Sequence, residues 1–161
     1  MILALDPSST CLGFAVAESG TSDPVRMIEF GRITPDKPRT TVYGRTISII
    51  RQLADCDFER PDYTVIEIPA LRPPRHARGQ ARTGQALYGM AVGLIVAHVE
   101  AHPLRYGAMV LVAADEWTHT AKAKRAAAIA ALYPEYRAAA DPGMDIADAI
   151  GLAAWYVESQ R

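Results

Sequence analysis

The sequence has little cysteine, almost no net charge and no long hydrophobic run. Its two cysteines, Cys11 and Cys56, form no C-x-x-C pair, which disfavours zinc sites and disulfide frameworks and predicts a reducing, cytoplasmic environment. With a formal net charge of −1, any affinity for nucleic acid must come from local basic patches. The longest apolar run, residues 87–99, is too short to span a bilayer. The N-terminus lacks the basic start of a signal peptide, so we expect no membrane segment.

The composition is that of a folded domain. Half of the 161 residues are hydrophobic and 22% are charged, which excludes a disordered chain and allows a sizeable core. No internal repeat or linker divides the sequence. We therefore expect one domain over residues 1–161.

The pattern of apolar residues predicts an α/β fold. Short apolar runs bounded by turn residues predict five strands, at residues 2–5, 12–17, 27–33, 63–68 and 109–113. Apolar residues at helical spacing predict four helices, at residues 39–53, 84–101, 118–132 and 145–157. A three-strand meander followed by alternating helices and strands indicates a mixed five-stranded sheet with helices on both faces.

Four acidic residues interrupt apolar segments of this pattern. Asp6 ends the first strand, and Glu67 lies inside the apolar run of the fourth. Asp145 and Asp148 are three residues apart and share one face of the last helix. Each has an ordinary alternative role: a turn or cap residue, a solvent-facing strand residue, or a helix-start pair that complements the macrodipole.

Taken together, the four acids predict a divalent-cation site. No lysine or arginine is near any of them in the sequence, so converging carboxylates would repel one another and raise each other's pKa. Hard oxygen ligands favour Mg²⁺ or Mn²⁺. Two such ions, about 3.5–4 Å apart, can activate water and stabilise the leaving oxygen of a phosphodiester.

Four motifs resemble those of RuvC-type Holliday junction resolvases, in the same order and over nearly the whole chain. Residues 5–16 (LDPSSTCLGFAV) resemble the first-strand motif, and residues 65–67 (VIE) the second acidic motif. Residues 84–89 (GQALYG) are similar to the start of the following helix, and residues 145–149 (DIADA) to the terminal motif.

This resemblance implies an RNase H-like fold, a homodimer, two Mg²⁺ or Mn²⁺ ions per site and paired cuts in four-way DNA junctions. It implies that Asp6 bridges both ions and that Glu67, Asp145 and Asp148 complete their coordination. The small size and the loose match indicate a divergent, phage-type member, and the sequence departs from the family pattern at two positions. Ser8 stands where many members have glycine, and Thr118 stands where the family has a lysine that faces the phosphate.

Basic residues supply candidate DNA contacts. Arg72, Arg75, Arg78 and Arg82 follow Glu67 within one short stretch, which predicts a DNA clamp; the alternative is a solvated loop whose charges balance acids elsewhere. Lys122 and Lys124 lie at a predicted helix start, where positive charge opposes the macrodipole. They are candidates for phosphate contact and for replacing the missing lysine.

Three functions are compatible with these features. The first is an endonuclease for branched DNA. The second is a nuclease of the same fold that acts on flaps or RNA–DNA hybrids. The third is an ATP-binding module, because the turn at residues 6–10 also resembles the phosphate loop of actin-like domains. Those domains need a second phosphate loop and a much longer chain, so we favour the endonuclease.

Overall fold

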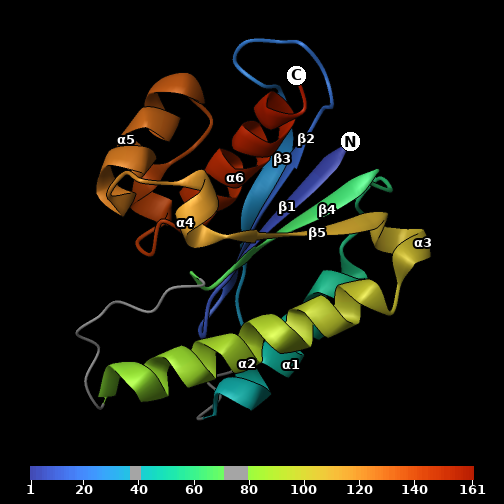
Figure 1. The fold of residues 1–161 in the computed structure, drawn as a ribbon, viewed down its shortest axis with the longest axis vertical. Helices are drawn as coiled ribbons and strands as arrows, with labels where there is room; N and C mark the ends of the chain where they lie inside the picture. Colours follow the sequence, from blue (N-terminus) through green and yellow to red (C-terminus); the bar gives the residue numbers. More distant parts are fainter. Residues whose placement is uncertain (37–40, 71–79) are drawn as a thin grey trace.

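A mixed five-stranded sheet forms the centre of the protein (Figure 1). The structure is a computed structural model that describes residues 1–36, 41–70 and 80–161, with the backbone alone for residues 80–83. The strand order is β3-β2-β1-β4-β5. The strands are β1 (Ile2–Pro7), β2 (Leu12–Ala17), β3 (Met27–Ile33), β4 (Tyr63–Ile68) and β5 (Ala108–Ala113). The pairs β1–β2 and β2–β3 are antiparallel, whereas β1–β4 and β4–β5 are parallel. The predicted meander and mixed sheet are confirmed.

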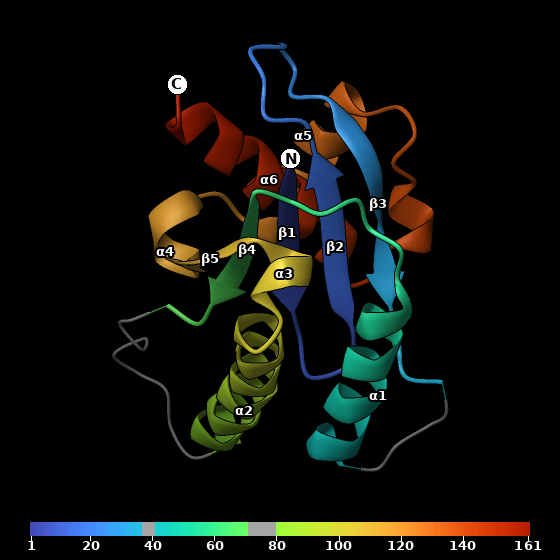
Figure 2. The ribbon, with the colours of Figure 1, turned by 90° about the vertical axis from the view of Figure 1, so that its right-hand side faces the viewer.

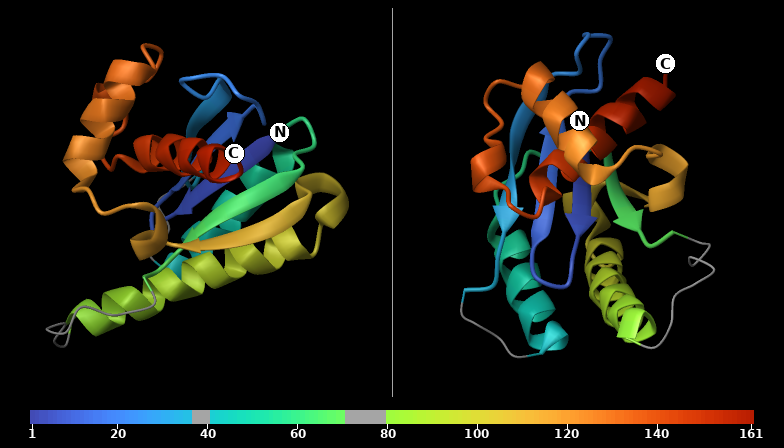
Figure 3. Two further views of the ribbon diagram at one scale, coloured as in Figure 1. Left: turned by 45° about the horizontal axis from the view of Figure 1, so that its top comes forward. Right: turned by 90° about the vertical axis from the view of Figure 1, so that its left-hand side faces the viewer.

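Helices cover both faces of the sheet, as predicted. Helices α1 (Val42–Asp55) and α2 (Gln80–Glu100) lie on one face (Figures 1 and 2). Helix α6 (Asp145–Ser159) packs on the other face, and α5 (Lys122–Leu132) packs against α6 (Figure 3). None of the helices in the described ranges has the length and hydropathy needed to cross a bilayer.

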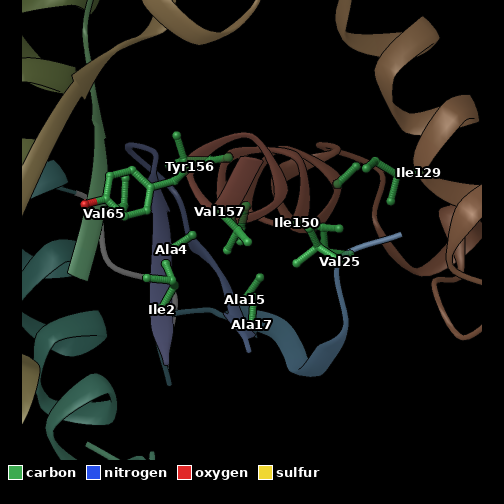
Figure 4. Close-up of a cluster of buried hydrophobic side chains, with 14 of the residues drawn as sticks. Ile2, Ala4, Ala15, Ala17, Val25, Val65, Ile129, Ile150, Tyr156 and Val157 are labelled. Carbon is green, nitrogen blue, oxygen red and sulfur yellow. The ribbon is translucent and has the colours of Figure 1, made fainter. Parts of the chain in front are cut away.

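The alternation of β1 side chains assigns each residue to one of two cores. Ile2 and Ala4 point toward α6 and pack with residues of that helix (Figure 4), whereas Leu3 and Leu5 belong to the core beneath α1 and α2. All six residues of β1 are buried, as expected for a central strand covered on both sides. Because the side-chain period is two, the next even-numbered residue, Asp6, points toward α6.

The predicted helix over residues 118–132 is wrong at its start. A separate short helix, α4 (Ala114–Trp117), follows β5 directly, and α5 begins only at Lys122. Thr118 has extended backbone angles, and its side-chain oxygen accepts a hydrogen bond from the Thr120 amide at 3.4 Å. This local bond replaces helical hydrogen bonding and separates the two helices.

Two other short elements were not predicted. They are α3 (Pro103–Tyr106), which follows α2 almost directly, and a 3-10 turn, Ala138–Ala140, that precedes α6. Both are a single turn long, too short for a periodic apolar pattern to develop.

Close approach of α6 to the sheet depends on Gly13. This residue is paired with Asp6 across β1 and β2, and a Cβ placed on it would lie 2.1 Å from the carbonyl oxygen of Asp145.

We expect Gly13→Ala to lower the free energy of unfolding by about 1–3 kcal/mol, the usual cost of overpacking, in a urea titration. Gly20→Ala is the matched control, since nothing lies within 4 Å of its added Cβ. Equal midpoints for the two variants would contradict this interpretation.

Candidate active site

The register of the sheet brings Asp6 and Glu67 to the same place. In the parallel pair β1–β4, Ala4 is opposite Val65 and Leu5 is opposite Ile66, so Asp6 and Glu67 come next at the carboxyl ends of the two strands. Ala4 and Val65 both belong to the core beneath α6. Two residues further along each strand, the carboxylates therefore point to the same side of the sheet.

The first turn of α6 adds the other two acids. Asp145 and Asp148 are buried, with 7% and 3% of their surfaces exposed. The close contact between Gly13 and the Asp145 backbone places this turn directly over the Asp6–Gly13 pair. The four predicted site residues therefore converge from three separate segments of the chain, at one end of the sheet.

Asp141, which lies in the segment just before α6, anchors the start of that helix. Its side chain is 1% exposed. Its Oδ1 accepts a hydrogen bond from the Asp145 amide, and its Oδ2 accepts bonds from the Ala147 amide and the Tyr136 hydroxyl, all at 3.0 Å. The carboxylate thereby satisfies helix N-terminal amides that would otherwise be unpaired, and it holds the first turn of α6, which carries Asp145 and Asp148.

Asp6 is the least satisfied of the four acids. It is 5% exposed, and its Oδ2 is the one fully buried side-chain oxygen or nitrogen in the described ranges that has no hydrogen-bond partner. Burial raises the pKa of Asp6 well above its ordinary value, and the charges of Glu67, Asp148 and Asp145 raise it further, while Lys122 opposes them. A buried carboxylate without a donor is costly, and a hard cation is the ligand that such an oxygen fits.

Glu67 has a related environment with one added donor. Burial raises the pKa of its carboxyl group, a hydrogen bond from Trp117 lowers it, and the charge of Asp148 raises it. The Trp117 Nε1 donates this bond to Glu67 Oε2 at 2.7 Å. No pattern in the sequence linked Trp117 to the acids.

The expectation that the acids lack basic neighbours is wrong for Asp145 and Asp148. Lys122 Nζ lies 2.9 Å from Asp148 Oδ2 and 3.5 Å from Asp145 Oδ1. Arg125 donates from Nη2 at 2.9 Å and from Nε at 3.0 Å to Asp148 Oδ1. The reason is tertiary packing, because α5 lies against α6 and sets the first turns of the two helices side by side.

Lys122 is therefore held by the acids rather than presented free to solvent. Burial would lower its pKa, but the hydrogen bond to Asp148 and the charges of Asp6, Asp148 and Asp145 raise it above its ordinary value. No three His, Cys, Asp or Glu side chains in the described part of the chain are arranged to hold an ion together as they stand. Withdrawal of Lys122 from Asp148 and Asp145 would free two further oxygens for an ion beside Asp6.

Cys11 is a second contact that the sequence did not predict. Its Sγ donates a hydrogen bond to Asp145 Oδ2 at 3.0 Å. Burial raises the pKa of this thiol to about 11, with a further contribution from Asp145. The thiol therefore stays protonated and acts as a donor at neutral pH.

Most of the predicted DNA contacts fall where the structure gives no side-chain position. Arg72, Arg75 and Arg78 lie outside the described residues, and Arg82 lies in α2 where the backbone alone is described. Lys124 is exposed on α5.

The environment of Asp6 predicts an unusual pH dependence of stability. Its folded-state pKa lies above its ordinary value of 3.8, so the preference for the protonated acid is present at low pH and is lost as pH rises through the folded pKa. In EDTA we expect Asp6→Asn to have a higher Tm than the wild type at pH 8 and a smaller advantage at pH 5.

Thermal unfolding of Glu135→Gln provides the matched control, because Glu135 is exposed and this variant should follow the wild type at both pH values. Added Mg²⁺ should raise the Tm of the wild type, because at one hundred times Kd the bound ion adds about 2.7 kcal/mol to the free energy of unfolding. It should leave the Tm of Asp6→Asn unchanged. An Asp6→Asn Tm that tracks the wild type under every condition would refute this account.

The comparisons with known proteins concern the fold. No protein-family model matches the sequence, and no curated protein matches it. Among solved structures, T. thermophilus RuvC in complex with Holliday junction substrate aligns with a TM-score of 0.60 at 16% identity, and a second Thermus thermophilus RuvC structure with 0.59 at 15%. Each alignment covers 99% of this chain and 94% of the other.

The yeast mitochondrial Holliday junction resolvase Ydc2 is also similar. It aligns with a TM-score of 0.55 at 13% identity, over 99% of this chain and 79% of Ydc2. The strand order, the two helical layers and these alignments agree with one another. The chain has the RNase H-like fold of the RuvC resolvases.

Proposed function

We propose that this protein is a metal-dependent endonuclease that cleaves phosphodiester bonds in branched DNA. The observation that carries the proposal is the buried, partnerless Oδ2 of Asp6 at the point where Glu67, Asp145 and Asp148 converge. Such a cluster suits a hard divalent cation, and it stands at one end of the sheet in a fold shared with junction resolvases.

The four acids have distinct roles in this proposal. Asp6 and Glu67, fixed by adjacent strands, would bind the ions from the sheet side. Asp148 and Asp145, fixed by α6, would bind them from above. Two bound Mg²⁺ or Mn²⁺ ions supply an activated water and stabilise the leaving oxygen. The protein's part is to orient the carboxylates and to exclude bulk water around Asp6, which is achieved by the burial already described.

Lys122 would change partners when the site is loaded. Without an ion, Lys122 and Arg125 neutralise Asp148 and Asp145. Released from these acids, Lys122 is positioned to contact a phosphate, so it is our candidate for the role of the lysine that Thr118 replaces. Lys124, exposed two residues further along α5, would contribute to the backbone contact.

A homodimer is the assembly that we propose. The first half of α2 extends beyond the ends of the strands (Figure 3) and exposes apolar side chains, with Leu87 41% and Met90 37% exposed. Association of two copies through this helix would cover them and place two sites on one four-way junction. The two free cysteines suit the reducing environment of the cytoplasm, which we propose as the location.

Asp6→Asn should abolish cleavage of a four-way junction in Mg²⁺ while leaving junction binding intact, because the change removes an ion ligand and no DNA contact. Cleavage is measured on labelled junctions and binding by gel shift in Ca²⁺. A normal cutting rate in Asp6→Asn would disprove the assignment.

The substrate class needs its own assay. The wild type should cut a four-way junction faster than a flap or an RNA–DNA hybrid of the same sequence. Faster cutting of the flap or the hybrid would favour the second function considered above, and ATP binding without any cleavage would favour the third.

Changing both Arg75 and Arg78 to alanine should weaken junction binding and flatten its dependence on salt. Removing one phosphate contact reduces the steepness of log K against log salt by about 0.9. Binding is measured at several salt concentrations by fluorescence anisotropy. Arg26→Ala is the matched control, because Arg26 is an exposed arginine paired with Glu18. A slope that the double change leaves unaltered would make these arginines ordinary surface residues.

A further inference from the structure

Trp117 is the largest side chain at the site, and the proposed chemistry does not use it. Helix α4 follows β5 without a loop, so its last residue, Trp117, stands at the carboxyl edge of the sheet beside the end of β4. There its Nε1 donates to Glu67 Oε2 at 2.7 Å. An indole N–H can only donate a hydrogen bond. The bond fixes Oε2 of Glu67 and leaves Oε1 as the oxygen that can bind an ion.

The indole is packed against α6 through a glycine. A Cβ on Gly151 would lie 3.1 Å from Cζ3 and 3.4 Å from Cη2 of Trp117. Gly151 comes one turn after Asp148 on the same helix. The missing side chain therefore makes room for the ring close to the acids, and the ring position depends on this helix.

Arg125 holds the same ring and a second acid. Its guanidinium carbon lies 5.2 Å from the centre of the Trp117 ring, within the range of a cation–π contact. The same guanidinium binds Asp148 Oδ1 and donates to Thr118 Oγ1 at 3.0 Å. Trp117 is thus linked directly to Glu67 and, through Arg125, to Asp148.

We propose that Trp117 is a positioning residue that, with Arg125 stacked on it, orients the Glu67 carboxylate toward Asp6 and thereby sets the affinity of the site for divalent cations. This inference rests on the proposed function, because it requires the four-acid site to bind an ion. Partners that hydrogen-bond a ligating carboxylate fix its orientation, and their loss typically costs about 10–100-fold in metal affinity or activity.

The test is Mn²⁺ binding, measured from the electron paramagnetic resonance signal of the free ion. Trp117→Phe keeps an aromatic ring under Arg125 and removes the N–H donor. We expect its Kd for Mn²⁺ to rise by about 10-fold or more. Trp155→Phe is the matched control, since Trp155 is the other tryptophan of the chain and packs at the edge of the apolar core beneath α6. Its Kd should equal that of the wild type.

Gly151→Ala tests the same idea without touching a polar group. Alanine is the better helix former, so this variant should unfold no more readily than the wild type. The added Cβ should displace the Trp117 ring by a few tenths of an ångström and weaken Mn²⁺ binding severalfold. Weaker binding with undiminished stability is a combination that a purely structural role for Trp117 would not produce.

A spectroscopic measurement completes the test. In Trp155→Phe, Trp117 is the only tryptophan, and Mg²⁺ should change its emission saturably because the carboxylate that accepts its hydrogen bond binds the ion through the other oxygen. Adding Asp6→Asn should remove the change.

The outcomes separate this inference from the proposed function. A wild type that binds no Mn²⁺ and cuts no junction overturns both. A wild type that binds Mn²⁺, with Trp117→Phe and Gly151→Ala at the same Kd, overturns the positioning role alone. Should Trp117→Phe fail to fold, the Kd of Gly151→Ala decides.

Discussion

Mutual repulsion of buried carboxylates is the constraint around which one end of this molecule is organised. Four acids from β1, β4 and α6 lie close together, three of them buried and Glu67 partly buried, and burial disfavours the charged forms of Asp6 and Glu67. The fold keeps the acids there with fixed backbone geometry: parallel register between β1 and β4, and a hydrogen-bonded start to α6 from Asp141. Their repulsion is relieved unequally, since Asp145 and Asp148 have cationic partners and the Oδ2 of Asp6 has no donor.

The same geometry explains why small residues matter at this end of the sheet. Gly13 lets the α6 backbone come down onto β2, and Gly151 lets the Trp117 ring lie against α6. Both glycines serve close approach rather than an unusual backbone conformation, and each lies beside one of the acids. Packing and electrostatics are therefore not separable here, because an added methyl group at either position would displace a carboxylate or its partner.

Local sequence patterns were sufficient for much of the fold. The strands at 12–17, 27–33 and 63–68 have the predicted bounds, because β-branched or apolar runs end at clear turn residues. Alternation along β1 and β4 places Asp6 and Glu67 on one side of the sheet only once the register of the parallel pair is known. By contrast, the break between α4 and α5 depends on a side-chain hydrogen bond of Thr118. The spacing of apolar residues along the sequence does not reveal such a bond.

The basic and aromatic partners of the acids could not be predicted from the sequence, for a related reason. Lys122 and Arg125 meet Asp148 through helix–helix packing between residues far apart in the sequence, and Trp117 meets Glu67 from another strand connection. No spacing rule links such residues. Sequence patterns therefore identified the candidate ligands and missed the side chains that hold them.

The pairing of Lys122 and Arg125 with the acids has a consequence for the order of events at this site. With all groups ionised, four carboxylates and two basic side chains leave the site formally two charges negative, which repels a phosphate. Under the proposed function, uptake of two divalent ions would reverse the sign and release Lys122 at the same moment. The end of the sheet would then change from a surface that repels the DNA backbone into one that attracts it, so loading of the cations would precede productive engagement of the strand to be cut.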